Sequence, residues 1–116
     1  MDDPRIEAVL KLIGRDIRRP LRPAELAAEV GLSVSRFYDL FREATGAVPA
    51  RYIRRYRFEK AKELLLTTNL SVKEVANCAG IRDDSHFVRD FRKLYGMSPR
   101  AFRRAHRAVP ARPDEM

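Results

Sequence analysis

The sequence has a single cysteine, Cys78, and so cannot form an internal disulfide. Neither this cysteine nor the two histidines approach the spacing of zinc ligands, and we expect no metal site. No apolar run is long enough to cross a bilayer, and the first residues lack the pattern of a secretory signal. These absences favour a cytoplasmic protein with no cofactor, no metal and no membrane partner.

Residues of catalytic type are also sparse. The sequence has no glycine-rich phosphate loop, and His86 and His106 stand far from any obvious nucleophile or paired acid. The adjacent acids Asp83 and Asp84 precede a helical pattern, and capping of that helix explains them better than catalysis does. We therefore expect a protein that binds, and not an enzyme.

No segment alternates apolar and polar residues over a useful length, so we predict no β-strand. Apolar residues recur at helical spacing instead, which predicts an all-α fold of seven helices. The first helix is expected over about 4–19, with Pro20 helping to end it. The others are expected over about 23–30, 34–45, 49–67, 72–79, 84–95 and 99–107.

Positive charge is in excess. The chain has 24 Lys and Arg against 16 Asp and Glu, a net charge of +8 and a pI near 10.2. A pI above about 9 is typical of nucleic-acid-binding domains. Residues 21–48 carry three basic and four acidic side chains, a net charge of −1. Residues 49–66 carry six against two (+4), and residues 82–107 carry eight against three (+5). The positive field is therefore expected along the middle and the second half of the chain.

One pattern occurs twice, in residues 21–49 and in residues 70–99. Each copy has a short helix, a turn glycine (Gly31 or Gly80) and a longer helix with two phenylalanines. This is the layout of a helix-turn-helix, whose second helix is narrow enough to enter the major groove of DNA. We therefore predict two DNA-binding units. The matching residues are Phe37 and Phe87, Phe41 and Phe91, Gly46 and Gly96, and Pro49 and Pro99.

The phenylalanines are expected in the core, and Leu94 and Tyr95 continue the apolar stripe of the second copy. Their neighbours on each helix then face outward. In the first copy, over 34–45, they are Ser35, Arg36, Tyr38, Asp39 and Arg42. In the second, over 84–95, they are Asp84, Ser85, Val88, Arg89 and Arg92.

The segment between the two copies is expected to act as a spacer. About 18 helical residues at 1.5 Å each give a rod of roughly 27 Å. Successive major-groove faces on one side of DNA lie about 34 Å apart. A helix over 49–67 therefore permits the two recognition helices to occupy neighbouring grooves.

Two long motifs carry a resemblance to a known family. They are PAELAAEVGLSVSRFYDLFREATGAVPARYIRRYRFEKAKELL and SVKEVANCAGIRDDSHFVRDFRKLYGMSPRAFRR. From about Ile6 to Arg107 the chain resembles the DNA-binding domain of AraC/XylS bacterial transcription regulators. The resemblance implies two helix-turn-helix subdomains that bind one bipartite site in double-stranded promoter DNA, usually activating transcription with RNA polymerase.

The resemblance also implies boundaries and contacts. The domain covers 1–109, with a first subdomain over 5–48, a linker helix over 49–67 and a second subdomain over 70–107, followed by a flexible tail over 110–116. The family's base-contacting positions fall on Ser35, Arg36, Tyr38, Asp39, Arg42, Asp84, Ser85, Val88 and Arg89. The arginines that we expect to contact phosphates are Arg54, Arg55, Arg92, Arg103 and Arg104.

The sequence departs from the family pattern at two places. Ile81 stands where the family usually has Phe, which should change packing but not the fold. Asp39 lies on the groove-facing side, where it either accepts from a cytosine amino group or orients Arg36 or Arg42. Because the first copy carries little positive charge, we expect it to choose sequence while the linker and second copy attract phosphates.

The sequence leaves two questions open. The chain is either a sequence-specific regulator or a binding module without sequence choice, such as an architectural DNA-binding protein or a helical protein-interaction module. It is also either a small stand-alone regulator or, as we favour, the C-terminal domain of a protein with a preceding sensing or dimerisation domain.

Overall fold

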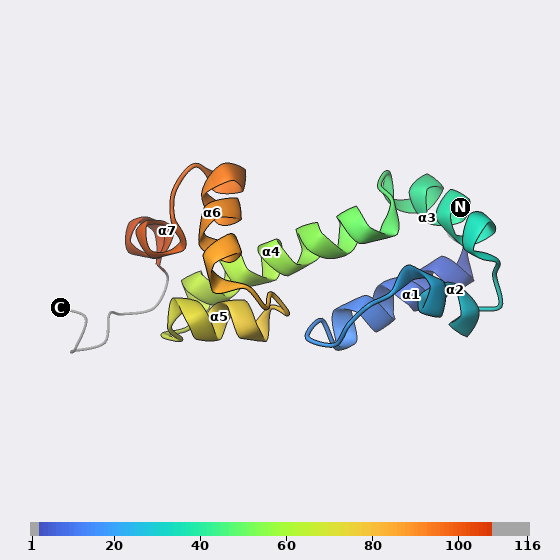
Figure 1. Cartoon of the computed structure of the whole chain (residues 1–116), viewed down its shortest axis with the longest axis horizontal. Coiled ribbons are helices and arrows are strands. Elements are labelled where there is room, and N and C mark those ends of the chain that lie inside the picture. The colour runs from blue at the N-terminus through green and yellow to red at the C-terminus, as the bar shows by residue number, and fades with distance from the viewer. Residues whose placement is uncertain (1–2, 108–116) are drawn as a thin grey trace. The chain divides into compact units, whose positions relative to one another are not determined.

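The computed structural model describes residues 3–107, apart from the side chain of Asp84. Over this range it contains seven α-helices and no strand, which confirms the predicted all-α fold. The helices are α1 (Pro4–Arg15), α2 (Pro23–Glu29), α3 (Val34–Thr45), α4 (Pro49–Thr67), α5 (Val72–Cys78), α6 (Asp84–Tyr95) and α7 (Pro99–His106) (Figure 1). The tail predicted over 110–116 lies outside the described residues. None of the described helices is long and apolar enough to cross a bilayer.

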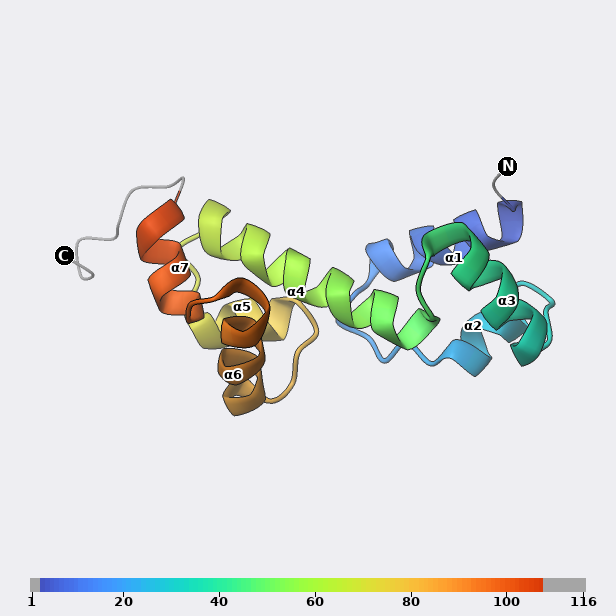
Figure 2. The same cartoon turned by 90° about the horizontal axis from the view of Figure 1, so that it is seen from above.

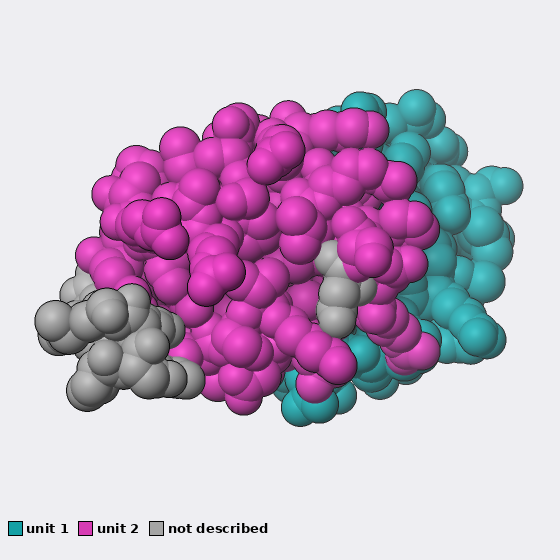
Figure 3. Space-filling view, turned by 60° about the vertical axis from the view of Figure 1, so that its left-hand side comes forward, with its two compact units in different colours: residues 1–56 teal, residues 57–116 magenta. Residues whose placement is uncertain are grey.

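The chain divides into two compact units, residues 1–56 and 57–116, and the boundary lies within α4 (Figure 3). Each unit has its own apolar core, built on a different part of α4. The first core contains Ile6, Val9, Ile13, Ile17, Leu26, Ala27, Phe37, Phe41 and Ile53. The second contains Phe58, Ala61, Leu65, Val75, Ala76, Ala79, Phe87 and Phe91.

Capping residues set where the helices begin. Ser33, Ser71, Asp83 and Ser98 each accept a hydrogen bond from the backbone N–H three residues further on. At Ser71 the capping box is complete, because Glu74 also accepts from the Ser71 backbone N–H at 2.8 Å. These side chains satisfy N–H groups that have no partner within the helix.

Glycine ends the two longer helices of the repeated pattern. Gly46 and Gly96 both have φ of +81°, and their backbone N–H groups donate to the carbonyl oxygens of Arg42 and Arg92. Only glycine adopts this left-handed conformation at little cost. The predicted ends of α3 and α6 are therefore confirmed.

Two predictions from helical spacing were wrong. The first helix ends at Arg15 and not near residue 19, yet Ile17 is buried because it reaches the core from the turn that follows. Leu94 is 50% exposed, not in the core. In α6 the inner positions are taken by Phe91 and Tyr95, against which Phe102 of α7 packs at centroid distances of 5.5 and 6.3 Å.

Candidate nucleic-acid interface

In the first unit α2 and α3 form a helix-turn-helix. Gly31, with φ of +71°, makes the turn, and the Leu32 backbone N–H donates to the carbonyl oxygen of Ala27 at 2.9 Å. Two fully buried rings then fix α3. Phe37 and Phe41 lie 5.6 Å apart, and Phe41 meets Tyr52 of α4 edge-on at 5.3 Å. Because these rings define the inner face, the opposite face of α3 is left to solvent. Figure 2 shows α3 beside α1 and α2.

The outer face of α3 contains the residues predicted for it. The exposed members are Ser35, Arg36, Asp39 and Arg42. Tyr38 is only half-buried, with its ring 6.3 Å from that of Phe37 in an edge-to-face arrangement. Tyr38 therefore combines partial core packing with an accessible portion, whereas the other four are wholly surface residues.

Asp39 forms an ion pair with Arg42, with an Oδ1–Nη2 distance of 4.0 Å. Both side chains are about two-thirds exposed, so the pair contributes little to folding stability. The ion pair supports one of the two roles considered for Asp39, the orientation of Arg42. The Asp39 carboxylate also offsets the positive charge of Arg42 on this face.

The second unit repeats this arrangement with α5 and α6. Gly80 has φ of +82°, and the Ile81 backbone N–H donates to the carbonyl oxygen of Ala76 at 2.8 Å. Phe87 lies 5.7 Å from Phe91 on α6 and 5.7 Å from Phe58 on α4. Ile81 packs against this core, so the core accommodates the departure from the family pattern.

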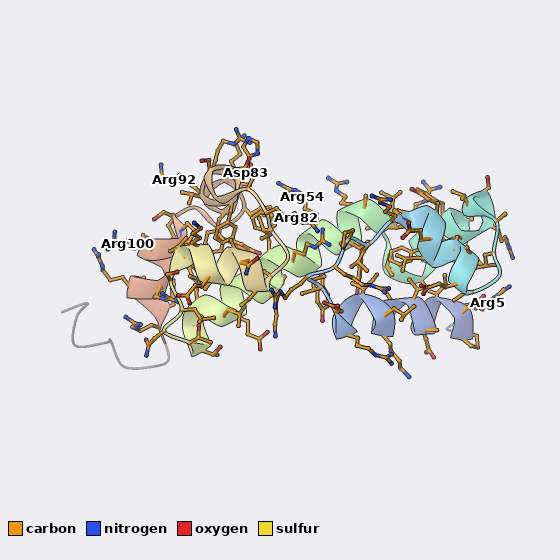
Figure 4. All side chains as sticks on the ribbon, turned by 60° about the horizontal axis from the view of Figure 1, so that its bottom comes forward. Arg5, Arg54, Arg82, Asp83, Arg92 and Arg100 are labelled. Atoms are coloured by element: carbon orange, nitrogen blue, oxygen red, sulfur yellow. The ribbon has the colours of Figure 1, made fainter. Side chains whose placement is uncertain are left out.

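The outer face of α6 again presents the predicted residues, apart from Asp84, whose side chain lies outside the described part of the chain. Ser85, Val88, Arg89 and Arg92 are exposed, and Arg92 is labelled in Figure 4. The Nε of Arg89 lies 3.3 Å from Oδ1 of its neighbour Asp90. The α6 face thus combines one small polar residue, one apolar residue and two cations.

The N-terminus of α6 is fixed by Asp83. Its carboxylate accepts from the His86 backbone N–H at 3.1 Å, and its Oδ2 lies 3.0 Å from His86 Nδ1. The hydrogen bond from the His86 N–H lowers the pKa of Asp83 below its usual value. This confirms the predicted capping role for Asp83, and the cap explains why an acidic residue stands at this position.

Arg54 and Arg55 of the first unit, and Arg92 and Arg104 of the second, have exposed side chains. Arg103 differs, because it is buried and donates from Nε to the Leu65 carbonyl oxygen and from Nη2 to that of Thr68. A buried guanidinium that caps the end of α4 does not reach a phosphate. We therefore remove Arg103 from the candidate phosphate contacts.

Two further arginines of the second unit, which were not among the predicted phosphate contacts, lie near each other. Arg57 is half-buried on α4, and Arg82 is exposed in the turn before α6 (Figure 4). Burial and the nearby positive charge of Arg82 lower the pKa of the Arg57 guanidinium. The position of Arg82, directly before the cap of α6, was the available sequence signal. Arg57 had none, because its proximity to Arg82 depends on tertiary packing.

The paired helix-turn-helix arrangement is also what known proteins share with this chain. A family model described as a helix-turn-helix domain matches residues 26–105. A solved AraC-type DNA-binding-domain protein from Chromobacterium violaceum superposes with a TM-score of 0.81 and 30% identity, over 93% of this chain and 96% of that one. The chain belongs to the AraC/XylS family.

Three other similar proteins bear on function. The DNA-binding domain of AdpA, solved in complex with a target DNA, superposes with a TM-score of 0.82 at 30% identity, covering 89% of this chain and 93% of that one. The transcriptional activator NphR of Rhodococcus sp is 41% identical over 86 residues, which is 74% of this chain and 25% of NphR. The probable regulator LumQ of Photobacterium leiognathi is 36% identical, over 75% of this chain and 35% of LumQ. This chain thus spans about a quarter to a third of these curated relatives.

Proposed function

We propose that this chain binds a specific site in double-stranded promoter DNA, with α3 and α6 in neighbouring major grooves, and activates transcription together with RNA polymerase. One observation carries the proposal. In each unit the second helix of a helix-turn-helix buries its phenylalanines and exposes a polar face, in a fold shared with the AdpA domain solved on DNA. The names of the relatives support regulation, and NphR is named as an activator.

The exposed side chains supply suitable chemistry for reading base edges. Arginine pairs with guanine O6 and N7, serine bonds to several bases, and an apolar group contacts the thymine methyl. On α3 the proposed readers are Ser35, Arg36, Tyr38, Asp39 and Arg42. On α6 they are Asp84, Ser85, Val88 and Arg89.

Phosphate contacts supply most of the affinity in this proposal. We assign them to Arg54, Arg55, Arg92 and Arg104, and add Arg57 and Arg82. The first helix-turn-helix then carries more of the sequence choice, and α4 together with the second helix-turn-helix supplies more of the attraction. The protein acts by binding and not by catalysis, in the cytoplasm where bacterial promoters lie.

Selection of bound sequences from a random DNA pool tests the proposal. We expect two short, unlike half-sites, because α3 and α6 present different side chains. A specific regulator should also resist competition by bulk DNA by a factor of about 10³ or more. A palindromic site would contradict binding of one chain across the whole site. Absence of any enriched sequence would overturn sequence specificity and leave an architectural protein.

A further inference from the structure

A polar network links the C-terminal end of α6 to α4 within the second unit. The Tyr95 hydroxyl donates to Oε1 of Glu59 at 3.1 Å. Oε2 of the same carboxylate lies 3.1 Å from Nζ of Lys62, and this ammonium group lies 4.9 Å from the centre of the Tyr95 ring. The three side chains thus contact one another pairwise, and two of them belong to α4.

Building on the proposed function, we propose that Glu59, Lys62 and Tyr95 are positioning residues that set the rotation of α6 about its own axis, and thereby its base preference. None of them lies on the predicted DNA-reading face. They act through the helix that carries that face.

The geometry explains how such a network controls rotation. Tyr95 is the last residue of α6, and its ring packs on Phe91 at 4.6 Å while its hydroxyl is held by Glu59 of α4. A helix turns as one body, so any rotation that moves Arg89 moves Tyr95 through the same angle. At a side-chain radius of about 5–6 Å, a rotation of about 10° shifts a side chain by about 1 Å. Displacements of this size weaken a recognition site.

Stability alone does not account for the network. The side chains of Lys62 and Glu59 are 32% and 52% exposed, and an ion pair at such exposure contributes little to folding free energy. A cation over an aromatic ring at a partly exposed site adds a similarly small amount. The network is therefore weak as a stabiliser, but three separate contacts define one orientation.

The first unit differs at the corresponding place. Thr45 precedes Gly46 as Tyr95 precedes Gly96. Its hydroxyl lies 2.9 Å from the carbonyl oxygen of Phe41 and 3.0 Å from that of Ala47, and accepts from the Ala47 N–H. Within the described residues, these polar contacts of Thr45 stay at the end of α3 and do not reach α4. The inference therefore predicts an effect on one half-site alone.

The test uses the full chain and the site that it selects from a random pool. Tyr95→Phe removes the hydroxyl and keeps the ring, and Glu59→Ala removes the carboxylate. The matched control is Glu63→Ala, because Glu63 pairs with Lys60 on the same helix at 3.5 Å and has the same charge. The half-site read by α6 is identified as the one whose preference changes in Arg89→Ala. Affinity is then measured for every single-base substitution, at several salt concentrations, along with thermal unfolding.

We expect Tyr95→Phe and Glu59→Ala to lose about three- to tenfold discrimination in the α6 half-site and none in the other. Tyr95→Phe should keep the wild-type salt dependence, and Glu59→Ala should match the salt dependence and unfolding midpoint of Glu63→Ala. The inference is overturned if discrimination stays unchanged, falls equally in both half-sites, or falls as much in Glu63→Ala. A wild-type chain that enriches no site would overturn the proposed function itself, and the inference with it.

Discussion

Arg103 on α7 donates a hydrogen bond from its Nε to the carbonyl oxygen of Leu65, 3.0 Å away near the C-terminal end of α4. Its Nη2 donates to the carbonyl oxygen of Thr68 at 3.3 Å. The last carbonyls of a helix have no partner within that helix, and a cation there also interacts favourably with the helix dipole. A single buried side chain thereby joins α7 to the end of α4.

Replacing this guanidinium should destabilise the second unit. Arg103→Met keeps the apolar stem but removes both donors, leaving two carbonyl oxygens without these bonds. We expect a loss of about 2–3 kcal/mol in the free energy of unfolding, measured by urea denaturation. Arg104→Met is the control, because Arg104 is exposed on the same helix and should change stability by less than about 0.5 kcal/mol. Equal unfolding midpoints for the two variants would contradict the capping role.

The role of Arg103 also shows where sequence reasoning succeeds and where it stops. Helix starts at Ser33 and Ser71, and the end at Gly46, follow from capping chemistry a few residues long, so they were predictable. An arginine contacting Leu65, 38 positions away, depends on which carbonyls another helix leaves unsatisfied. No local pattern contains that information.

The candidate interface was likewise predictable only in part. The exposed faces of α3 and α6 follow from the placement of paired phenylalanines at helical spacing, so most predicted readers are exposed. Leu94 and Tyr95, three and four residues after Phe91, both have helical spacing, but Phe102 of α7 packs against Tyr95 and Leu94 is left exposed. Periodicity identifies an inner stripe, whereas the neighbouring helices decide how wide that stripe is.

The cap of α6 should make the stability of the second unit sensitive to acid. The His86 N–H lowers the pKa of Asp83 in the folded chain, whereas the unfolded value is about 3.9. The stabilisation is therefore present above about pH 4 and is lost as the pH falls through the lower folded pKa. Asn also caps helices well but carries no charge. We expect Asp83→Asn to have a lower melting temperature than wild type at pH 7.

That difference should shrink steadily as the pH is lowered below 4, where the wild-type carboxyl also becomes neutral. Differential scanning calorimetry between pH 2 and pH 7 measures it directly. A gap between the two melting temperatures that does not change with pH would show that the Asp83 charge is unimportant.

Asp39→Asn separates the two roles considered for this acid. If Asp39 orients Arg42 through their 4.0 Å ion pair, base preference should change only at the position that Arg42→Gln also affects. If Asp39 accepts from a cytosine amino group, a different position should change. We expect the first result, together with an affinity increase of about twofold on all sequences from removal of one negative charge.

Glu43→Gln provides the comparison for Asp39→Asn. Glu43 is exposed on the same helix and carries the same charge, but it was not predicted to read bases. It should therefore raise affinity similarly without altering preference at any base. Binding to a panel of single-base variants of the selected site measures both effects.

Substitutions of Arg92 and Arg42 should have different effects on DNA binding if α6 mainly attracts phosphates and α3 mainly reads bases. Arg92→Gln removes an exposed cation of α6 and should weaken binding to every sequence by a similar factor. It should also reduce the slope of log affinity against log salt by about 1, because one fewer counterion is released. Arg42→Gln should instead relax preference at particular bases by about 1–3 kcal/mol. If both variants lowered affinity while base preference stayed constant, α3 would not be the principal reader, and the low positive charge of residues 21–48 would need another explanation.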